Sequence, residues 1–211
     1  MPLQNRVTPT GEIISTAARG TFMGNRGLLH DENQRLVRTS RLPAWLICRL
    51  EFNGRHREVM APRRYTELFF LDEAVALAAG HRPCAECRRP SYRAYLDAAN
   101  VGEDDPITGA KDLDGRLGAA RTAPRGTAEL MTLPDGVFVA LADGDPRLLW
   151  QGALHRWTPE GYVDRVATAD VGVDRATVLT PALSVRALRN GYPVAVHPSV
   201  ESPPSPGQQT R

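Results

Sequence analysis

Two cysteines, Cys84 and Cys87, are separated by two residues in the basic stretch G-H-R-P-C-A-E-C-R-R-P, which runs from Gly80 to Pro90. One tight turn of this kind can supply two thiolate ligands to a zinc ion. A thioredoxin-type redox pair is disfavoured, because a predicted helix precedes the pair where that chemistry needs a strand. Tetrahedral zinc requires two further ligands. The candidates along the chain are Cys48, His30, His56 and His81.

The segments around this C-x-x-C knuckle are predicted to hold it between two helices. Asp72 can cap a helix that ends at Gly80, and Pro83 then fixes the turn that presents the cysteines. Pro90 suits the first turn of a second helix. Upstream, residues 44–52 read as a strand that carries Cys48, followed by a turn and a return strand over residues 55–60. A strand close to the knuckle would bring Cys48 to the metal.

The stretch from Val59 to Arg89 resembles a known zinc domain. It contains an aromatic pair at Phe69-Phe70, an alanine-rich helix with Glu73-Ala74 at its start and Ala79-Gly80 at its end, and then R-P-C-x-x-C-R. These pieces, about 30 residues in all, are similar to the second half of the Ada-like amino-terminal zinc domain of DNA-repair proteins, and to small Ada-like modules appended to nucleases. The resemblance implies that Cys84 and Cys87 are zinc ligands.

The remaining two ligands depart from the Ada pattern, which has another cysteine pair before the aromatic strand. The appended modules use a histidine and a cysteine after a glycine-asparagine turn, and residues 24–30 resemble that turn. The resemblance therefore nominates His30 together with Cys48. His56 and His81 stay open as rivals, and a buried apolar Cys48 beside a metal-free cysteine pair is the remaining alternative. The methyl-acceptor cysteine of Ada has no clear counterpart here, so phosphotriester repair is not implied.

Charge is distributed unevenly and favours an anionic partner for the front half. Residues 1–99 hold 15 arginines against 10 acidic residues, whereas residues 100–211 hold 11 basic against 14 acidic residues. The expected partner is nucleic acid, DNA rather than RNA, with phosphates contacted by arginines around the knuckle. These are Arg63, Arg64, Arg82, Arg88 and Arg89. The alternative is a hydrolase or nuclease-like enzyme that uses His30 with neighbouring acids such as Asp31, Glu32, Glu51 or Glu67.

The fold class predicted is α+β. A small mixed sheet with helices flanking the knuckle is expected over residues 1–100, a linker or irregular excursion over 101–132, and a small β-rich domain over 133–198. A disordered tail is expected over 199–211, where proline, serine and glutamine dominate. Three cysteines without a secretory signal, and no apolar run of about 20 residues, favour a cytoplasmic protein with no membrane segment. Whether the protein is catalytic, and its oligomeric state, stay open.

Overall fold

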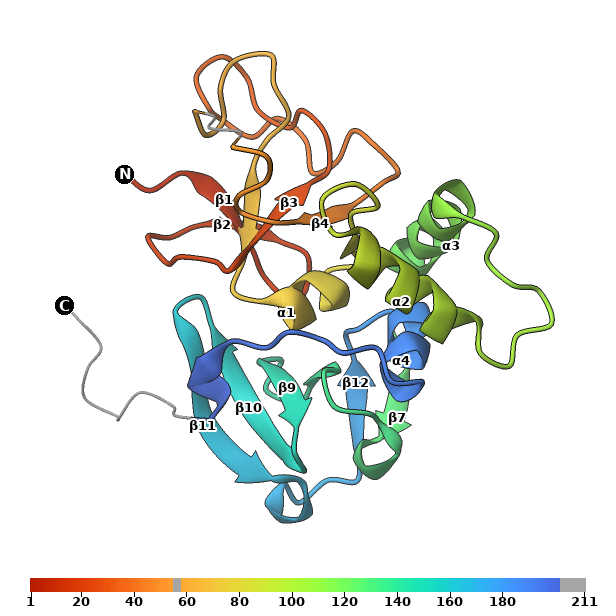
Figure 1. The fold of residues 1–211 in the computed structure, drawn as a ribbon. Coiled ribbons are helices and arrows are strands. Elements are labelled where there is room, and N and C mark those ends of the chain that lie inside the picture. Colours follow the sequence, from red (N-terminus) through yellow and green to blue (C-terminus); the bar gives the residue numbers. More distant parts are fainter. Residues whose placement is uncertain (55–57, 202–211) are drawn as a thin grey trace.

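The computed structural model describes residues 1–54 and 58–201 as two six-stranded sheets and four α-helices (Figure 1). The two sheets lie at opposite ends of the molecule, and the helices lie between and beside them. The predicted α+β class is confirmed. Among the described residues there is no helix long and apolar enough to cross a membrane.

The first sheet is mixed and forms the front lobe. Its strand order is β2-β1-β5-β3-β4-β6, with parallel pairing of β1 with β5 and of β4 with β6. The glycine-rich segment over residues 20–27 supplies β3, which pairs on one side with β5 and on the other with β4. The strands are β1 (Gln4–Val7), β2 (Ile13–Ser15), β3 (Phe22–Asn25), β4 (Leu46–Cys48), β5 (Leu68–Phe70) and β6 (Arg82–Pro83).

The second sheet forms the back lobe and is antiparallel throughout. Its order is β11-β10-β9-β8-β12-β7, so that four consecutive strands form a meander and the edge strand β7 comes from earlier in the chain. The strands are β7 (Thr127–Glu129), β8 (Phe138–Ala140), β9 (Pro146–Trp150), β10 (Ala153–Thr158), β11 (Gly161–Ala167) and β12 (Arg175–Val178).

The helices begin and end at the residues that local chemistry favours. The Asp72 side chain accepts a hydrogen bond from the Val75 backbone at 2.9 Å, which caps α1 (Glu73–Ala78). Gly80 follows with a φ of 82°, a left-handed conformation, and a Cβ atom there would lie 2.7 Å from Arg121 Cγ. Pro90 lies in the first turn of α2 (Arg89–Asn100). The other helices are α3 (Ala110–Thr122) and α4 (Ala182–Arg189).

One hydrophobic core runs through both lobes. A single cluster of buried residues contains Leu68 and Phe70 of the first sheet, α1, and Phe138 and Leu148 of the second sheet. The segment after α4 crosses the molecule beneath α1 and ends beside β11 (Figure 1). A separate small C-terminal domain is therefore not confirmed, because its core is continuous with that of the front lobe.

Three local predictions need correction. Residues 101–132 are more than a linker, since they supply α3 and β7, and Leu113 and Leu117 of α3 are fully buried. In place of the return strand predicted for residues 55–60, the partners of β4 are β3 and β6; residues 58–60 are not a strand, and 55–57 lie outside the described residues. Of the predicted disordered tail, Ser199 and Val200 form a short 3-10 turn, and residues 202–211 lie outside the described part.

Candidate metal centre

Three cysteine side chains meet at the edge of the first sheet. The sulfur atoms of Cys48, Cys84 and Cys87 all lie within 4.8 Å of one another. None of the three forms a disulfide, and their exposed fractions are 8%, 7% and 9%. They form a small buried cluster apart from the main core, packed against Met23, Leu46 and Phe52. Cys48 thus joins the knuckle cysteines, as proposed from the sequence.

Backbone pairing explains why Cys48 reaches the knuckle. β4 and β6 are parallel, with Ile47 opposite Pro83, so the cysteine that follows each of these paired residues, Cys48 or Cys84, lies beside the other. The Cys84 backbone N–H donates to the Ile47 carbonyl at 2.9 Å, which continues the pairing up to the cluster. The turn then delivers Cys87, and the Arg88 N–H donates to the Cys84 carbonyl at 3.1 Å as α2 begins. The cluster therefore joins a strand, a turn and a helix.

The three thiols shift one another's pKa values chiefly through hydrogen bonds. Hydrogen bonds from the Cys48 and Cys87 thiols lower the pKa of the Cys84 thiol, and the Glu86 backbone N–H also donates to Cys84 Sγ at 3.4 Å. The same interaction with Cys84, together with burial, raises the pKa of Cys48. One thiolate is thus favoured at Cys84, and a cation would favour deprotonation of the others.

The donor set fits a thiophilic metal ion. Tetrahedral zinc with Zn–S bonds of about 2.3 Å separates its ligands by about 3.8 Å. The sulfur cluster is compact enough for this geometry. A cavity of about 270 Å3 lies beside it, lined by all three cysteines and by Glu67, among others. Glu67 is buried; its Oε2 accepts from the Met60 N–H at 2.8 Å, and its Oε1 has no hydrogen-bond partner among the described residues. A fourth ligand has room to approach from this side.

The histidines predicted as ligands are not part of the sulfur group in the described structure. His30 is buried, with Nδ1 2.6 Å from Thr66 Oγ1 and Nε2 3.3 Å from the Ala61 carbonyl, so both ring nitrogens already have partners. His81 is fully buried, and its Nε2 accepts a hydrogen bond from Arg26 Nε at 3.1 Å. His56 lies outside the described residues. The same burial of His30 argues against the alternative of a hydrolytic centre built on that residue.

The five arginines predicted to contact phosphates divide into two groups. Arg82 and Arg88 are buried and ion-paired, Arg82 with Asp114 at 2.8 Å and Arg88 with Glu73 at 2.6 Å. Their guanidinium groups are occupied inside the protein, so the expectation that these two bind phosphate needs correction.

Arg63, Arg64 and Arg89 are exposed and remain candidates for phosphate contact. Among them, Arg63 lies 3.4 Å from Glu32 in a surface ion pair. Such a pair is weak in water and can open when a phosphate approaches.

A second group of candidate residues, two arginines around one tryptophan, was not anticipated from the sequence. Arg26 is fully buried, and its guanidinium carbon lies 3.7 Å from the centre of the Trp45 ring. Arg121 approaches the same ring at 4.3 Å. The three residues come from distant parts of the chain, so no local motif could have linked them.

Comparison of the chain with protein-family models, with curated proteins and with solved structures finds no match. The chemistry of the site is therefore inferred from its own residues.

Proposed function

We propose that this is a zinc-stabilised nucleic-acid-binding protein. Cys48, Cys84 and Cys87 hold the ion, and exposed arginines of the front lobe contact phosphates. The observation that carries the metal part of the proposal is the convergence of three buried sulfur atoms. Zinc is favoured among thiophilic ions because it prefers tetrahedral thiolate ligands and needs no redox partner.

In this proposal the ion has a structural role. The sulfur cluster lies where β4, β6 and the start of α2 meet, and each of these segments contributes to it or adjoins it. An ion bound there would link these three segments, so its binding energy would become folding energy. The fourth ligand is supplied from the side of the neighbouring cavity.

Metal content and cobalt spectroscopy test the metal site. Purified protein is expected to contain about one zinc ion per chain. Replacement by Co2+ should give the intense visible bands of a tetrahedral thiolate site. Cys48→Ser should lower metal content and thermal stability together, whereas Ser184→Ala, a fully buried change in α4, should keep the metal. Metal-free protein with the full melting temperature of the wild type would contradict the proposal.

The nucleic-acid part is supported by the arginines at the free end of the front lobe. The loops over residues 27–38 and 58–66 lie together at the end of the molecule far from the second sheet (Figure 1). They are joined by hydrogen bonds, among them Gln34 Nε2 to the Val59 carbonyl at 3.3 Å and the Thr66 N–H to the Gly27 carbonyl at 3.0 Å. Exposed arginines on or next to these loops are Arg35, Arg38, Arg41, Arg49, Arg63 and Arg64.

Salt dependence tests this part independently of the metal. The affinity for a labelled DNA duplex should fall steeply between about 50 and 200 mM salt, because phosphate contacts release counterions. The double variant Arg38→Gln/Arg64→Gln should reduce the slope of log K against log salt by roughly 2. The control Arg165→Gln changes an exposed arginine on β11 and should leave the slope unchanged. A duplex affinity independent of salt, or no binding at low salt, would sink this part.

A further inference from the structure

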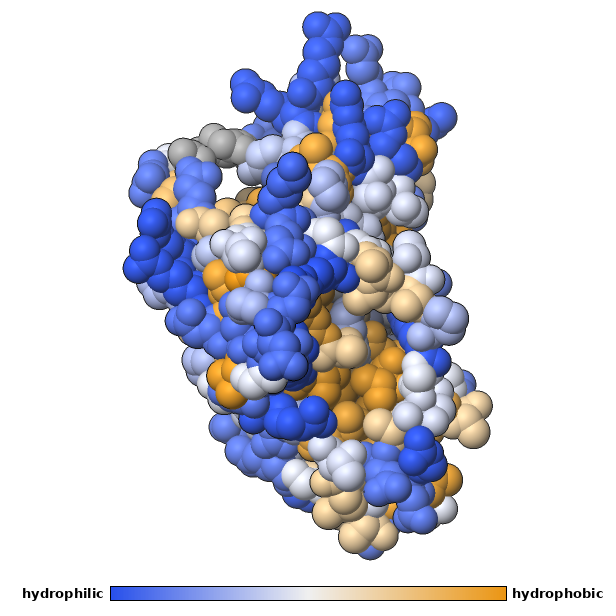
Figure 2. Space-filling model, turned by 90° about the vertical axis from the view of Figure 1, so that its right-hand side faces the viewer, coloured by the Kyte–Doolittle hydropathy of each residue, from blue (hydrophilic) through white to orange (hydrophobic). Residues whose placement is uncertain are grey.

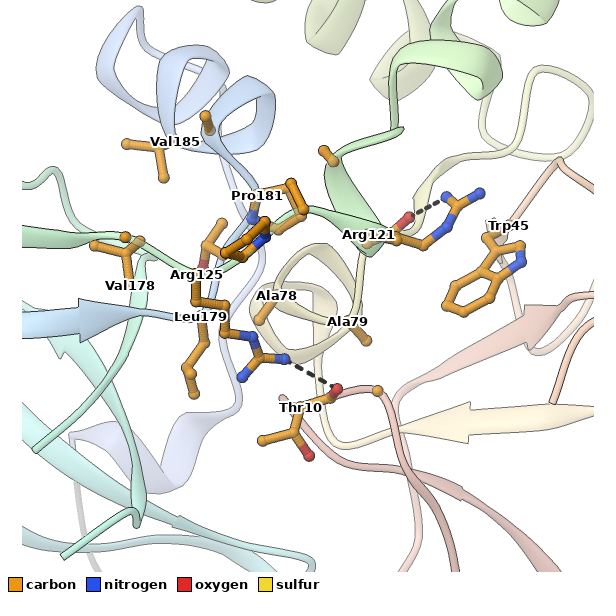
Figure 3. Close-up of a pocket in the computed structure, with 18 of the residues that line it drawn as sticks. Thr10, Trp45, Ala78, Ala79, Arg121, Arg125, Val178, Leu179, Pro181 and Val185 are labelled. Carbon is orange, nitrogen blue, oxygen red and sulfur yellow. Dashed lines mark hydrogen bonds between the residues drawn. The ribbon is translucent and has the colours of Figure 1, made fainter. Parts of the chain in front are cut away.

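Two cavities border the front lobe, and their walls differ in chemistry. The larger, of about 680 Å3, lies between the lobes and has an apolar floor with a hydrophilic rim (Figure 2). Its guanidinium groups are dispersed, since Arg121 extends toward Trp45 and Arg125 toward Thr10 (Figure 3). The smaller cavity, of about 270 Å3, is lined by all three cysteines of the cluster. Of these two cavities, the smaller therefore brings reactive side chains together.

The small cavity gives a small reagent access to the cysteine cluster. Among its lining residues, Arg49, Leu50 and Glu86 are exposed, whereas Phe52 and Tyr65 are half-buried. The three cysteines themselves keep exposed fractions of 8%, 7% and 9%. The cavity is several times larger than the roughly 30 Å3 that one water molecule occupies. A molecule as small as hydrogen peroxide has room to reach the sulfur atoms from this side.

Strand register brings Cys48 and Cys84 into position for a disulfide bond. Ile47 pairs with Pro83, and the Cys84 N–H donates to the Ile47 carbonyl at 2.9 Å, so the two cysteines occupy adjoining positions on parallel chain segments. Neighbouring strands lie about 4.8 Å apart, and disulfides join Cα atoms that are about 4.4–6.8 Å apart. The two sulfur atoms lie within 4.8 Å of each other. The bond therefore requires rotation of the side chains and little movement of the backbone.

Cys87 is attached differently from the other two cysteines. Its sulfur atom accepts a hydrogen bond from the Arg49 backbone N–H, and the residue lies in the turn that leads into α2. If Cys48 and Cys84 are joined, Cys87 is the one thiol left in the cluster. Structural zinc sites use four protein ligands, so the loss of two of the three sulfur donors removes most of the site. A disulfide and a bound metal ion thus exclude each other.

We propose that the cysteine cluster is an oxidation site, at which a peroxide converts Cys48 and Cys84 into a disulfide and expels the metal ion. One of the two thiolates attacks an oxygen atom of the peroxide, the O–O bond breaks, and a sulfenic acid and hydroxide are formed. The second thiol attacks the sulfenic sulfur atom. The S–S bond then forms, the S–O bond breaks, and the departing hydroxide leaves as water with the thiol proton. The two sulfur atoms lose two electrons in total, and the peroxide gains them.

The two parts of this inference depend on different observations. Release of the ion rests on the proposed metal centre, whereas the disulfide rests on the positions of the cysteines alone. The reaction also differs from a thioredoxin-type exchange, because it joins a strand residue to the knuckle rather than the two cysteines of the C-x-x-C turn. The cluster would therefore be a reversible switch between a reduced, metal-bound form and an oxidised, metal-free form.

Peroxide titration of the full-length, metal-loaded protein tests the site. A small excess of hydrogen peroxide should release about one zinc ion per chain, followed with a chromogenic chelator. Peptide mass spectrometry without reductant should find Cys48 joined to Cys84. Dithiothreitol followed by zinc should restore the metal content, because a disulfide is reduced by thiols whereas a sulfinic acid is not. The control Ser184→Ala, in α4 and far from the cluster in sequence, should release zinc like the wild type.

The outcomes separate this inference from the proposed function. Metal-loaded protein that keeps its zinc and three reduced thiols in excess peroxide would overturn the inference and leave the metal centre intact. Protein that never contains metal, yet forms the Cys48–Cys84 disulfide, would contradict the metal centre alone. Cys87→Ser should still form the Cys48–Cys84 disulfide, because it keeps both partners. A bond between Cys84 and Cys87 in the oxidised wild type, or irreversible loss of thiols without a disulfide, would overturn the assignment.

Discussion

At the residue scale, Asp72 connects three segments of the chain through a single carboxylate. It caps α1 by accepting from the Val75 N–H, and it also accepts from the Tyr162 hydroxyl at 2.7 Å and from the His197 N–H at 2.9 Å. Tyr162 belongs to β11 and His197 to the segment after α4. Despite these donors, burial raises the pKa of Asp72 to about 6 from an ordinary value of 3.8. The carboxylate therefore links the two lobes by hydrogen bonds, although its burial disfavours the charged form.

This shift predicts a pH dependence of stability with a definite sign. Between about pH 4 and pH 6 the folded state binds the Asp72 proton and the unfolded state does not, so stability contributed by this group is lost as pH rises. The loss is on the order of 3 kcal/mol and is complete above about pH 6. In Asp72→Asn this component should disappear. Urea denaturation at several pH values would measure it.

The control for this prediction is Asp104→Asn, a change of an exposed carboxylate. Its stability profile should run parallel to that of the wild type from pH 4 to pH 7. Parallel profiles for Asp72→Asn and the wild type would show that Asp72 does not titrate in this range.

At the element scale, the ion pair between β6 and α3 fixes the helix beside the knuckle. Arg82 Nε donates to Asp114 Oδ1 at 2.9 Å, and Arg82 Nη2 donates to Asp114 Oδ2 at 2.8 Å, a two-point contact between side chains that are 5% and 11% exposed. Leu113 and Leu117 are buried on the same helix. The pair positions α3 so that Arg121, at its end, reaches Trp45 and lines the cavity of about 680 Å3 between the lobes.

Breaking this pair on one side should destabilise the protein strongly. Asp114→Asn leaves a buried arginine without its counter-ion and should lower the free energy of unfolding by about 3–5 kcal/mol. Arg82→Met/Asp114→Leu removes both charges and should recover most of that loss. Asp112→Asn, which alters a partly exposed pair with Arg116 on the same helix, should change it by less than about 1 kcal/mol. Equal effects of the two single substitutions, measured by urea denaturation, would contradict this role.

The sequence predicts those elements whose signals are local. Asp72, Gly80 and Pro90 predict the start of α1, its end and the start of α2, and each of these boundaries lies within two residues of the predicted position. The position of Cys48 on a strand near the knuckle could likewise be inferred. Helix α3 was missed because its sequence, A-K-D-L-D-G-R-L-G-A-A-R-T, has just two large apolar residues and two glycines.

Long-range pairing could not be predicted in the same way. The partners of β4 lie 20 or more residues away in both directions, at β3 and β6, so a turn signal after the strand wrongly suggested a local hairpin. Arg82 and Arg88 read as surface phosphate ligands because their partners, Asp114 and Glu73, are distant in sequence. Arg26 gives no local signal for its burial, since its neighbours in space are Trp45, His81 and Arg121.

At the scale of the whole molecule, the acidic start of α1 anchors the C-terminal segment to the front lobe. Glu73 accepts from the Tyr192 hydroxyl at 2.5 Å and from the Ala195 N–H at 3.1 Å, and its own N–H donates to the Ala195 carbonyl at 3.1 Å. It also holds Arg88, next to the knuckle cysteines. One buried carboxylate thus joins the start of α1, the Arg88 side chain next to the cysteine cluster, and the segment after α4.

The continuous core and this anchor predict that the two lobes unfold together. Two-state behaviour is expected where no boundary separates independent cores, and here one cluster of buried residues spans both sheets.

The three tryptophans allow a direct test, since Trp45 lies in the front lobe and Trp150 and Trp157 lie in the back lobe. In the double variant Trp150→Phe/Trp157→Phe, the fluorescence of the remaining Trp45 should report unfolding of the front lobe. In Trp45→Phe, the two remaining tryptophans should report unfolding of the back lobe. For each variant, the fluorescence transition in urea is expected to coincide with its own far-UV circular dichroism transition, because neither lobe can expose its core without opening the other. If the cysteine cluster binds zinc as proposed, a chelator should shift the transitions of both variants to lower urea, although every cysteine lies in the front lobe. A front-lobe signal that moves alone, or fluorescence transitions that separate from circular dichroism, would mean that the lobes are independent domains.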